Sequence, residues 1–274
     1  MSKKKVAILV LVIRFFAHIL VITLLTIITQ IGGLIWLISW PILRKWYPQQ
    51  RWRRLAVCSL IYLVVTLGLI PIVAPLLGRV ALPKWGSIVP QTYFTVLANR
   101  HYVRPSVLSA LENATKDFRG QYPDVKVVYL DANFPFYDGF PLLPHLSHSD
   151  GKKLDLSFIY QRDGELVNTK PATSGYGAYA GPKKDEYNQT TNCLKAGHWQ
   201  YDFSKYLSFG VDHNLELAEK PTKQLLNVLL AQPATQKILL EPHLRQRLGL
   251  PKSKVRFQGC HSVRHDDHLH WQVQ

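Results

Sequence analysis

The feature that most constrains this chain is the absence of acidic residues from its N-terminal part. No Asp or Glu occurs before Glu112, although residues 1–80 hold ten Lys and Arg side chains. Two stretches in this part carry no charge at pH 7, namely 29 residues from Phe15 to Leu43 and 23 residues from Leu55 to Leu77. A helix needs only about 20 apolar residues to cross the hydrocarbon core of a bilayer. The sequence therefore predicts a membrane anchor at residues 1–80 with two transmembrane helices, at about 15–40 and 55–77.

Two other interpretations of these stretches fit the sequence less well. A secretory signal peptide has an apolar core of about 7–15 residues and a small-residue cleavage site, and neither stretch has this form. A buried helical hairpin of a soluble protein would carry a polar stripe along each helix, and these stretches have none. We therefore expect the anchor to stay attached.

The segment between the two stretches indicates how the chain is oriented. Residues 44–54, RKWYPQQRWRR, contain five basic residues, which the positive-inside rule places in the cytoplasm. The second helix then leads outward, so we predict a protein of the inner (cytoplasmic) membrane whose C-terminal domain faces the periplasm or the cell exterior. A single crossing by the first helix would also place Lys3–Lys5 outside. Arg14, His18 and the pair Gly32-Gly33 could instead mark a shorter crossing or a partly re-entrant segment.

The net charge of +15 does not require a nucleic-acid partner. Ten of the 33 basic residues lie in the anchor, and the other 194 residues hold 23 basic and all 18 acidic groups. That balance is typical of an ordinary globular surface, so we expect no nucleic-acid binding. With 47% hydrophobic residues the chain is also too apolar to be disordered.

Residues 85–274 are predicted to form one α+β domain. Helical periodicity and strand-like runs alternate along this part, with Gly and Pro at the boundaries. We expect helices at 106–119, 221–231 and 243–248, strands at 125–130, 154–160, 236–240 and 268–273, and a loop at 168–191. Such an order is typical of a central antiparallel or mixed sheet with helices on one face.

The strongest chemical signal is the clustering of histidines in two short windows, His145 with His148, and His265 with His268 and His270. Asp155 follows His148 by seven residues, and Gly151 between them allows the backbone to turn. Period-two alternation places two sets of side chains on opposite faces of the predicted strand: Leu154, Leu156 and Phe158 toward the core, and Asp155, Ser157 and Ile159 toward a cleft. His268 and His270 would share one face of the last strand.

These residue types fit a catalytic zinc site, in which three N or O ligands leave a fourth position for water. The three cysteines are too few for a closed structural site of the four-cysteine kind. A single histidine is usually an ordinary surface or core residue, but two windows separated by over a hundred residues favour a metal. Asp266 and Asp267 could be no more than a solvated turn.

The pattern H-x6-D followed near the C-terminus by H-x-H resembles the zinc metallopeptidase group that includes lysostaphin-type peptidases, D-alanyl-D-alanine carboxypeptidases and the hedgehog signalling domain. The longer H-x-x-H-x-H form at 265–270 looks most like the penicillin-insensitive murein endopeptidases. The resemblance covers about residues 125–274, most clearly 147–158 and 221–273. The first motif reads HSDGKKLDL where a form like HQxGLDVD is expected, and the N-terminal arginine-containing region of the family is not found.

The resemblance implies a role for each matching residue. His148, Asp155 and His270 would be the zinc ligands, His268 the catalytic histidine, and His265 a second histidine of the site. The implied activity is a membrane-anchored, zinc-dependent peptidase acting on peptidoglycan stem peptides or cross-links, at an amide that involves D-alanine. SGYGAYAGP (174–182) would border the cleft or be a plain surface loop. Two alternatives remain open: a catalytically inactive, metal-containing cell-wall binding protein, and an interaction protein whose histidines are incidental.

The cysteines divide between the two parts of the chain. Cys58 lies in the second predicted span and should be a small apolar residue there. Cys193 and Cys260 lie in the predicted exported domain, where disulfides can form and persist. They could form a bridge or remain two free thiols.

Overall fold

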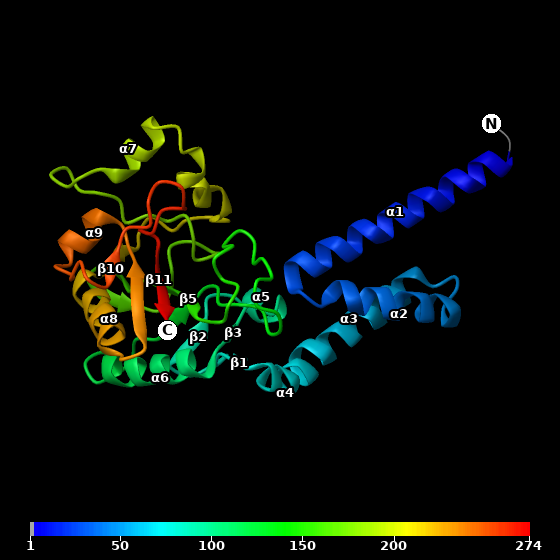
Figure 1. Cartoon of the computed structure of the whole chain (residues 1–274), viewed down its shortest axis with the longest axis horizontal. Coiled ribbons are helices and arrows are strands. Elements are labelled where there is room, and N and C mark those ends of the chain that lie inside the picture. Colours follow the sequence, from blue (N-terminus) through cyan, green and yellow to red (C-terminus); the bar gives the residue numbers. More distant parts are fainter. Residues whose placement is uncertain (1–2) are drawn as a thin grey trace.

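The computed structural model describes residues 3–274 and has two parts, a bundle of helices and a globular part (Figure 1). The helices are α1 (Lys3–Thr29), α2 (Gly32–Trp46), α3 (Arg51–Val64), α4 (Ile70–Val73), α5 (Tyr93–Leu97), α6 (Pro105–Arg119), α7 (Gln189–Lys195), α8 (Glu219–Ala231) and α9 (Pro242–Arg247). Short π and 3-10 segments are Val65–Leu69, Ala74–Leu77 and Trp199–Leu207. The strands are β1 (Val80–Ala81), β2 (Ile88–Pro90), β3 (Tyr102–Val103), β4 (Val127–Tyr129), β5 (Lys153–Ser157), β6 (Tyr160–Arg162), β7 (Glu165–Val167), β8 (Glu216–Leu217), β9 (Thr235–Leu239), β10 (Val255–Arg256) and β11 (His268–Val273).

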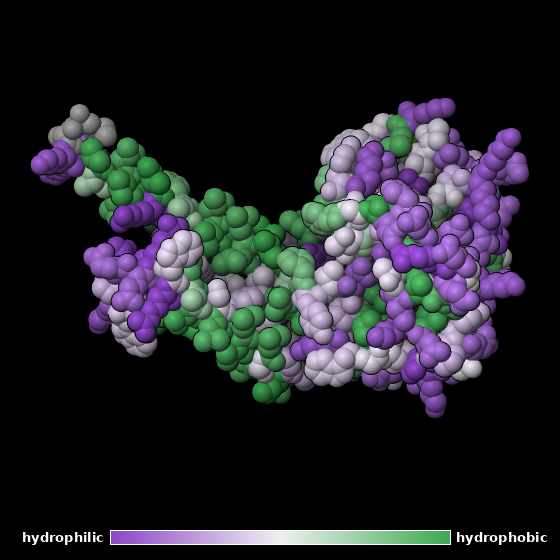
Figure 2. Space-filling view, turned by 180° about the vertical axis from the view of Figure 1, so that it is seen from behind, coloured by the Kyte–Doolittle hydropathy of each residue, from purple (hydrophilic) through white to green (hydrophobic). Residues whose placement is uncertain are grey.

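Two helices are long and apolar enough to cross a membrane, Lys3–Thr29 and the nearly continuous helix Arg51–Leu77, each of 27 residues. Both helices meet this criterion by length and composition alone. Because α1 lies near the N-terminus, a signal sequence there would meet the same criterion. Both helices present apolar side chains outward over most of their length (Figure 2). The structure therefore has two long apolar helices that could span a membrane, the number that the sequence predicts.

The predicted bounds of the first span, 15–40, are wrong. The chain reverses at Gln30 and Ile31, where Gln30 has a positive φ of 67°, and α2 runs back along α1. Gly33 permits the close approach, because a side chain there would overlap Thr26 and the carbonyl oxygen of Ile22. The uncharged stretch is thus a helical hairpin, which agrees with the alternative of a shorter or partly re-entrant crossing.

The hairpin also settles where the basic residues lie. Because α1 and α2 are antiparallel, Lys3–Lys5 and the basic segment 44–54 both lie at the end of the helical bundle that is distant from the globular part (Figure 1). Under the positive-inside rule, a hairpin of this kind would place both basic clusters on the same side of a membrane, so the two clusters would not conflict.

The helical bundle packs directly against the globular part at the α1–α2 turn. Gln30 Oε1 accepts a hydrogen bond from the Phe136 backbone N–H at 3.1 Å, and Asn99 Nδ2 donates to the Thr29 carbonyl oxygen at 3.2 Å. Around these bonds lies a small buried apolar cluster made of Ile31, Ile70, Ala74 and Tyr102. These contacts fix the position of the globular part relative to the helices.

The globular part is built on a six-stranded mixed sheet of order β10-β9-β11-β5-β4-β2. The central strands β9, β11, β5 and β4 pair antiparallel, while β10 and β2 join the two edges in parallel. A three-stranded sheet of order β7-β6-β8 and a two-stranded pair β1-β3 complete the fold. This arrangement confirms the α+β class and the mixed sheet.

Helices α6 and α8 pack against each other and cover one face of the large sheet (Figure 1). On that face lie the buried apolar residues of the two central strands, Leu154, Leu156, Leu269 and Trp271. Since side chains alternate along a strand, the polar residues between them must occupy the opposite face. Because the apolar residues pack under the helices, the polar residues of these strands lie together on the other face of the sheet.

One strand differs from its prediction. The expected strand 154–160 ends at Ser157, and the chain turns into β6 at Tyr160. Ile159 consequently does not face the cleft: it is fully buried in the apolar core, and its backbone N–H donates to Thr222 Oγ1 at 3.1 Å. The pattern of alternation could not reveal this break, because residues 158–160 are apolar and compatible with a longer strand.

Candidate metal centre

The register between β5 and β11 brings the two predicted motifs together. His270 lies opposite Asp155, and His268 lies opposite Ser157, on the face of the sheet away from α6 and α8. His148 approaches the same face from the preceding loop. That loop turns at Gly151, which has a φ of 78° and which contacts the Arg79 guanidinium so closely that a side chain would overlap it.

His148, Asp155 and His270 form a compact, buried group whose potential ligand atoms lie within 4.8 Å of one another. His148 Nε2 is 3.1 Å from Asp155 Oδ1 and 3.1 Å from His270 Nδ1, and His270 Nδ1 is 2.8 Å from Asp155 Oδ1. All three residues are buried. These are the three residues that the family resemblance implies as ligands, and the group could hold a metal ion.

The chemistry of these three groups fits a cation. His148 Nδ1 lies 2.7 Å from the Ala132 carbonyl oxygen, which can only accept, so Nδ1 carries a proton, and the neutral His148 ring presents its lone pair at Nε2. A backbone carbonyl that fixes the tautomer in this way is a common outer partner of a metal-ligating histidine. Asp155 Oδ1 is also an acceptor. Lone pairs thus converge at one point, and a cation would satisfy them together.

The electrostatics of the group depend on burial and on its neighbours. Burial alone would raise the pKa of Asp155, but His148 and His268 hold it well below its usual range. Burial lowers the pKa of His270 to about 4, which exceeds the opposite effect of Asp155. An ionised carboxylate beside a neutral imidazole is the protonation state that metal binding requires.

His268 lies beside the group and is held by a carboxylate of its own. Its Nε2 is 3.7 Å from Asp155 Oδ2, and its Nδ1 is 2.5 Å from Asp267 Oδ1. Burial would lower the pKa of His268, but Asp267 and Asp155 outweigh it and raise the pKa to about 9. The two carboxylates thus favour the protonated form of His268 next to the candidate metal centre.

His265 is a further histidine of the cluster and lies next to His268 and His270. Its ring centroid is 5.1 Å from that of His268 and 5.7 Å from that of His270. Burial, followed by the neighbouring His268 and His270, lowers the pKa of His265 well below its usual value. The His265 backbone N–H donates to Glu241 Oε1 at 3.0 Å, which anchors the turn before β11.

Tyr176 is a site residue that sequence analysis did not identify. Its hydroxyl donates to Asp155 Oδ2 at 2.9 Å, and the next residue, Gly177, donates its N–H to Asp267 Oδ2 at 2.6 Å. The segment SGYGAYAGP is therefore attached to the centre at two points and borders it, and the alternative of a plain surface loop is wrong. Tyrosine within a glycine-rich segment was the available signal.

A second ring of polar residues surrounds the centre. Asp131 accepts from Arg100 at 2.8 Å, and His145 Nδ1 lies 3.2 Å from Asp131 Oδ2 and 3.4 Å from Asp155 Oδ2. Burial would raise the pKa of Asp131, but Arg100 and His145 lower it. The sequence predicts no role for His145 beyond its place in the first histidine window, and it does not single out Asp131, which lies two residues after the buried strand β4.

The expectation that Asp266 and Asp267 form a solvated turn is wrong, since both are fully buried. Asp267 contacts His268 as described above, whereas Asp266 forms an ion pair with Arg264 at 2.5 Å. Both carboxylates therefore have partners that a solvated turn would not supply.

A disulfide between Cys193 and Cys260 joins the region after Gln189 to the segment that leads into the histidines, whereas Cys58 is free and buried in the helical bundle. The bridge therefore forms, and the alternative of two free thiols is wrong. It closes a loop of 67 residues beside the wall of the site.

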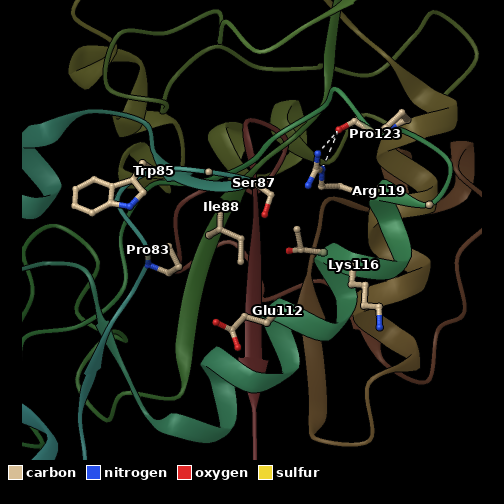
Figure 3. A pocket seen from close by; sticks show the side chains of 11 residues that line it. Pro83, Trp85, Ser87, Ile88, Glu112, Lys116, Arg119 and Pro123 are labelled. Atoms are coloured by element: carbon tan, nitrogen blue, oxygen red, sulfur yellow. Dashed lines mark hydrogen bonds between the residues drawn. The ribbon is translucent and has the colours of Figure 1, made fainter.

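The centre opens into a cavity of about 530 Å³, hereafter the metal cavity. Asp155, His265, His268 and His270 line it, together with Trp199 and Phe203 from the 3-10 segment Trp199–Leu207. A cavity of similar size, about 580 Å³, lies elsewhere, between α6 and residues 83–88 (Figure 3). None of the predicted site residues lines that second cavity, whereas four of them line the metal cavity.

The chain matches no model of a known protein family, and no curated protein is significantly similar to it.

Proposed function

We propose that this protein is a membrane-anchored, zinc-dependent peptidase that hydrolyses peptidoglycan stem peptides or cross-links, at an amide involving D-alanine. The observation that carries the proposal is the convergence of His148, Asp155 and His270 on one point, at the wall of an open cavity and beside His268. Two nitrogens and one oxygen are a ligand set that zinc accepts in catalytic sites. The substrate class comes from the resemblance to murein endopeptidases.

Zinc held by these three residues would polarise the scissile carbonyl and activate water for attack. The chain's own residues supply the rest. His268, kept protonated by Asp267, is placed to donate a hydrogen bond to the carbonyl oxygen as negative charge develops there, or to deliver a proton to the leaving amine. Tyr176 and His148's bond to Ala132 hold the ligands in orientation.

The orientation in the membrane follows from charge. With both basic clusters at the far end of the helical bundle, the positive-inside rule places that end in the cytoplasm and the globular part in the periplasm or outside the cell. A Cys193–Cys260 disulfide is consistent with such an oxidising compartment. Alkaline phosphatase, which is active only after export, tests this when fused to the C-terminus. A stable but inactive fusion would contradict the orientation and the murein substrate.

The activity is tested with the full chain purified in detergent. We expect about one zinc per chain by elemental analysis that covers the other first-row metals too. Incubation with purified murein should release peptides that mass spectrometry identifies, and chelators but not β-lactams should stop the release. Stoichiometric metal without any peptide release would instead favour the alternative, a catalytically inactive cell-wall binding protein. Absence of metal would contradict both.

A further inference from the structure

Three cavities adjoin one another between the candidate metal centre and the helical bundle. Next to the metal cavity lies a middle cavity of about 500 Å³, and Pro144 and His145 line both. Beyond it lies a groove of about 400 Å³ among α1, α2, α3 and α5, hereafter the helix groove. Phe94 lines both the middle cavity and the helix groove. The three spaces therefore lie next to one another, in the order metal cavity, middle cavity and helix groove, between the candidate metal centre and the apolar helices.

The polarity of the lining falls along this series. Histidines and an aspartate dominate the wall of the metal cavity. The middle cavity combines a buried ion pair, Arg100 with Asp131, with hydroxyl groups and apolar side chains. The helix groove is lined mostly by apolar residues, among them Leu25, Ile28 and Leu63 from helices long enough to span a membrane. An occupant of the whole series would have to be polar at one end and apolar at the other.

Arg100 marks the polar end of the middle cavity. It is 9% exposed, and one of its terminal nitrogens binds Asp131. Its Nε has no hydrogen-bond partner within residues 3–274. A buried donor without a partner costs about 1–3 kcal/mol. Arg100 also lines the middle cavity, so its guanidinium places a positive charge at the wall of that cavity.

The lining of the middle cavity includes exposed apolar side chains. Phe94 is 58% exposed and Phe209, which also lines the middle cavity, is 74% exposed. Exposed apolar side chains grouped at the rim of a cavity are typical of an interaction site. Because α5 lies where the α1–α2 turn meets the globular part, this rim faces the level at which a bilayer surrounding the helices would end (Figure 1).

We propose that the metal centre takes its substrate from the membrane, as a peptide attached to a lipid. The lipid chain lies in the helix groove, the polar linkage lies in the middle cavity beside Arg100, and the peptide reaches the metal cavity past Pro144 and His145. This inference rests on the proposed peptidase function and names its substrate class. An ordinary phospholipid would occupy the helix groove and leave the other two cavities empty, whereas a lipid-linked peptide would occupy all three.

Binding is tested without any requirement for turnover. The full chain in nanodiscs is irradiated with a stem peptide attached to a long alkyl chain that carries a diazirine, and the labelled residues are mapped by mass spectrometry. We expect labelling at 25–36, 58–63 and 94–98, displaced by excess unlabelled lipid-linked peptide. A diazirine phosphatidylcholine probe that labels the same residues and is not displaced by lipid-linked peptide would overturn the proposal, because the groove would then hold ordinary lipid only.

Two leucines on α3 provide a matched pair of variants. Leu63 lines the helix groove, whereas Leu60, also exposed on the same helix, does not. Leu63→Trp should fill the groove, and loss of contact for even two methylene groups lowers binding about tenfold. Leu60→Trp should leave labelling unchanged. Leu97→Trp, from the opposite wall of the groove, repeats the test if Leu63→Trp does not fold. Equal labelling of the groove-filling and the control variant would overturn the proposal.

Turnover gives the second measurement. The same peptide is supplied either free or attached to the lipid, and kcat/KM is measured for each. Leu63→Trp should lower kcat/KM for the lipid-linked form about tenfold and leave the free form unchanged, whereas Leu60→Trp should change neither. An equal effect of Leu63→Trp on both forms would overturn the lipid site. If the parent chain cleaves neither form, the peptidase function fails, and the labelling experiment still decides the lipid site.

Discussion

The helical bundle and the candidate metal centre show opposite patterns of burial: one exposes apolar side chains, and the other buries polar ones. Along α1 no residue of the most apolar window is buried, so Leu, Ile, Val and Phe side chains face outward. At the candidate metal centre polar residues are buried instead, among them His148, Asp155, Asp267 and His268. Exposed apolar groups are stable in a hydrocarbon environment, whereas buried polar groups are stable when each has a specific partner. The outer surface of the helices is therefore suited to a hydrocarbon environment, whereas the candidate metal centre depends on hydrogen-bond partners inside the protein.

This contrast teaches where single substitutions should matter. Outward-facing apolar residues contact few protein atoms, so many of them should be replaceable. The buried polar residues depend on one another, and removing one leaves its partner without a hydrogen bond. The predictions below test this dependence, from the largest expected effect to the smallest.

The largest effect should come from Asp155→Ala. We expect the bound metal to fall from about one per chain to near zero, with loss of peptide release, because Asp155 supplies the only carboxylate of the three-ligand group. Ser157→Ala is the matched control, since Ser157 is buried on the same strand and the same face. Elemental analysis of both variants decides the matter, and stoichiometric zinc in Asp155→Ala would refute the ligand assignment.

A smaller effect is expected when the metal stays but proton transfer is impaired. His268→Ala should retain zinc and lower kcat by about 10²–10⁴-fold, because it removes the hydrogen-bond donor beside the centre. Asp267→Asn should lower kcat less, by about 10–10²-fold, because His268 stays but loses the carboxylate that orients it. Metal content and kcat are measured together. Parent-like kcat in His268→Ala would exclude it from the mechanism.

The disulfide should contribute to stability rather than to chemistry. Closing a loop of 67 residues stabilises a chain by about 4 kcal/mol on the entropy model, or about 10 °C in Tm. Cys260→Ser should therefore lower the Tm of the detergent-solubilised chain by about that amount and make it insensitive to reductant. Cys58→Ala is the control and should keep the reductant sensitivity of the parent. An unchanged Tm in Cys260→Ser would show that the bridge adds no stability.

The smallest effect concerns acid stability through His101. Burial, with a smaller contribution from Lys84, lowers the pKa of His101 to about 3, and neither ring nitrogen has a partner within residues 3–274. Between pH 6.5 and about 3 the unfolded chain binds a proton there and the folded chain does not. Stability should therefore fall by about 1.4 kcal/mol for each unit by which pH decreases in this range.

His101→Phe should reduce this loss, so that its Tm decreases less than that of the parent between pH 6.5 and 5. His213→Phe, which replaces an exposed histidine, is the control and should behave as the parent does. Identical pH dependence of Tm in His101→Phe and the parent would contradict the role of His101.

Sequence patterns predicted the elements that carry the candidate ligands. Helical periodicity predicted α6 and α8. The alternation along the strands predicted the face of the sheet on which Asp155, His268 and His270 lie, because both patterns depend only on local geometry. The break after Ser157 and the reversal at Gln30 were not predicted at their true positions. In both places the residues are compatible with continuation, and long-range packing of Ile159 and Gln30 decides the conformation.

By itself the sequence determined the distribution of charge, the two apolar spans, the α+β class and the three residues that converge as a candidate metal site. The tertiary structure alone decided that Tyr176, Asp131 and Asp267 join that site and that three adjacent cavities lie between it and the helical bundle. The physical reason is separation along the chain. Asp155 lies 21 residues from Tyr176 and 115 from His270, so only the folding of the sheet and its loops brings them into contact.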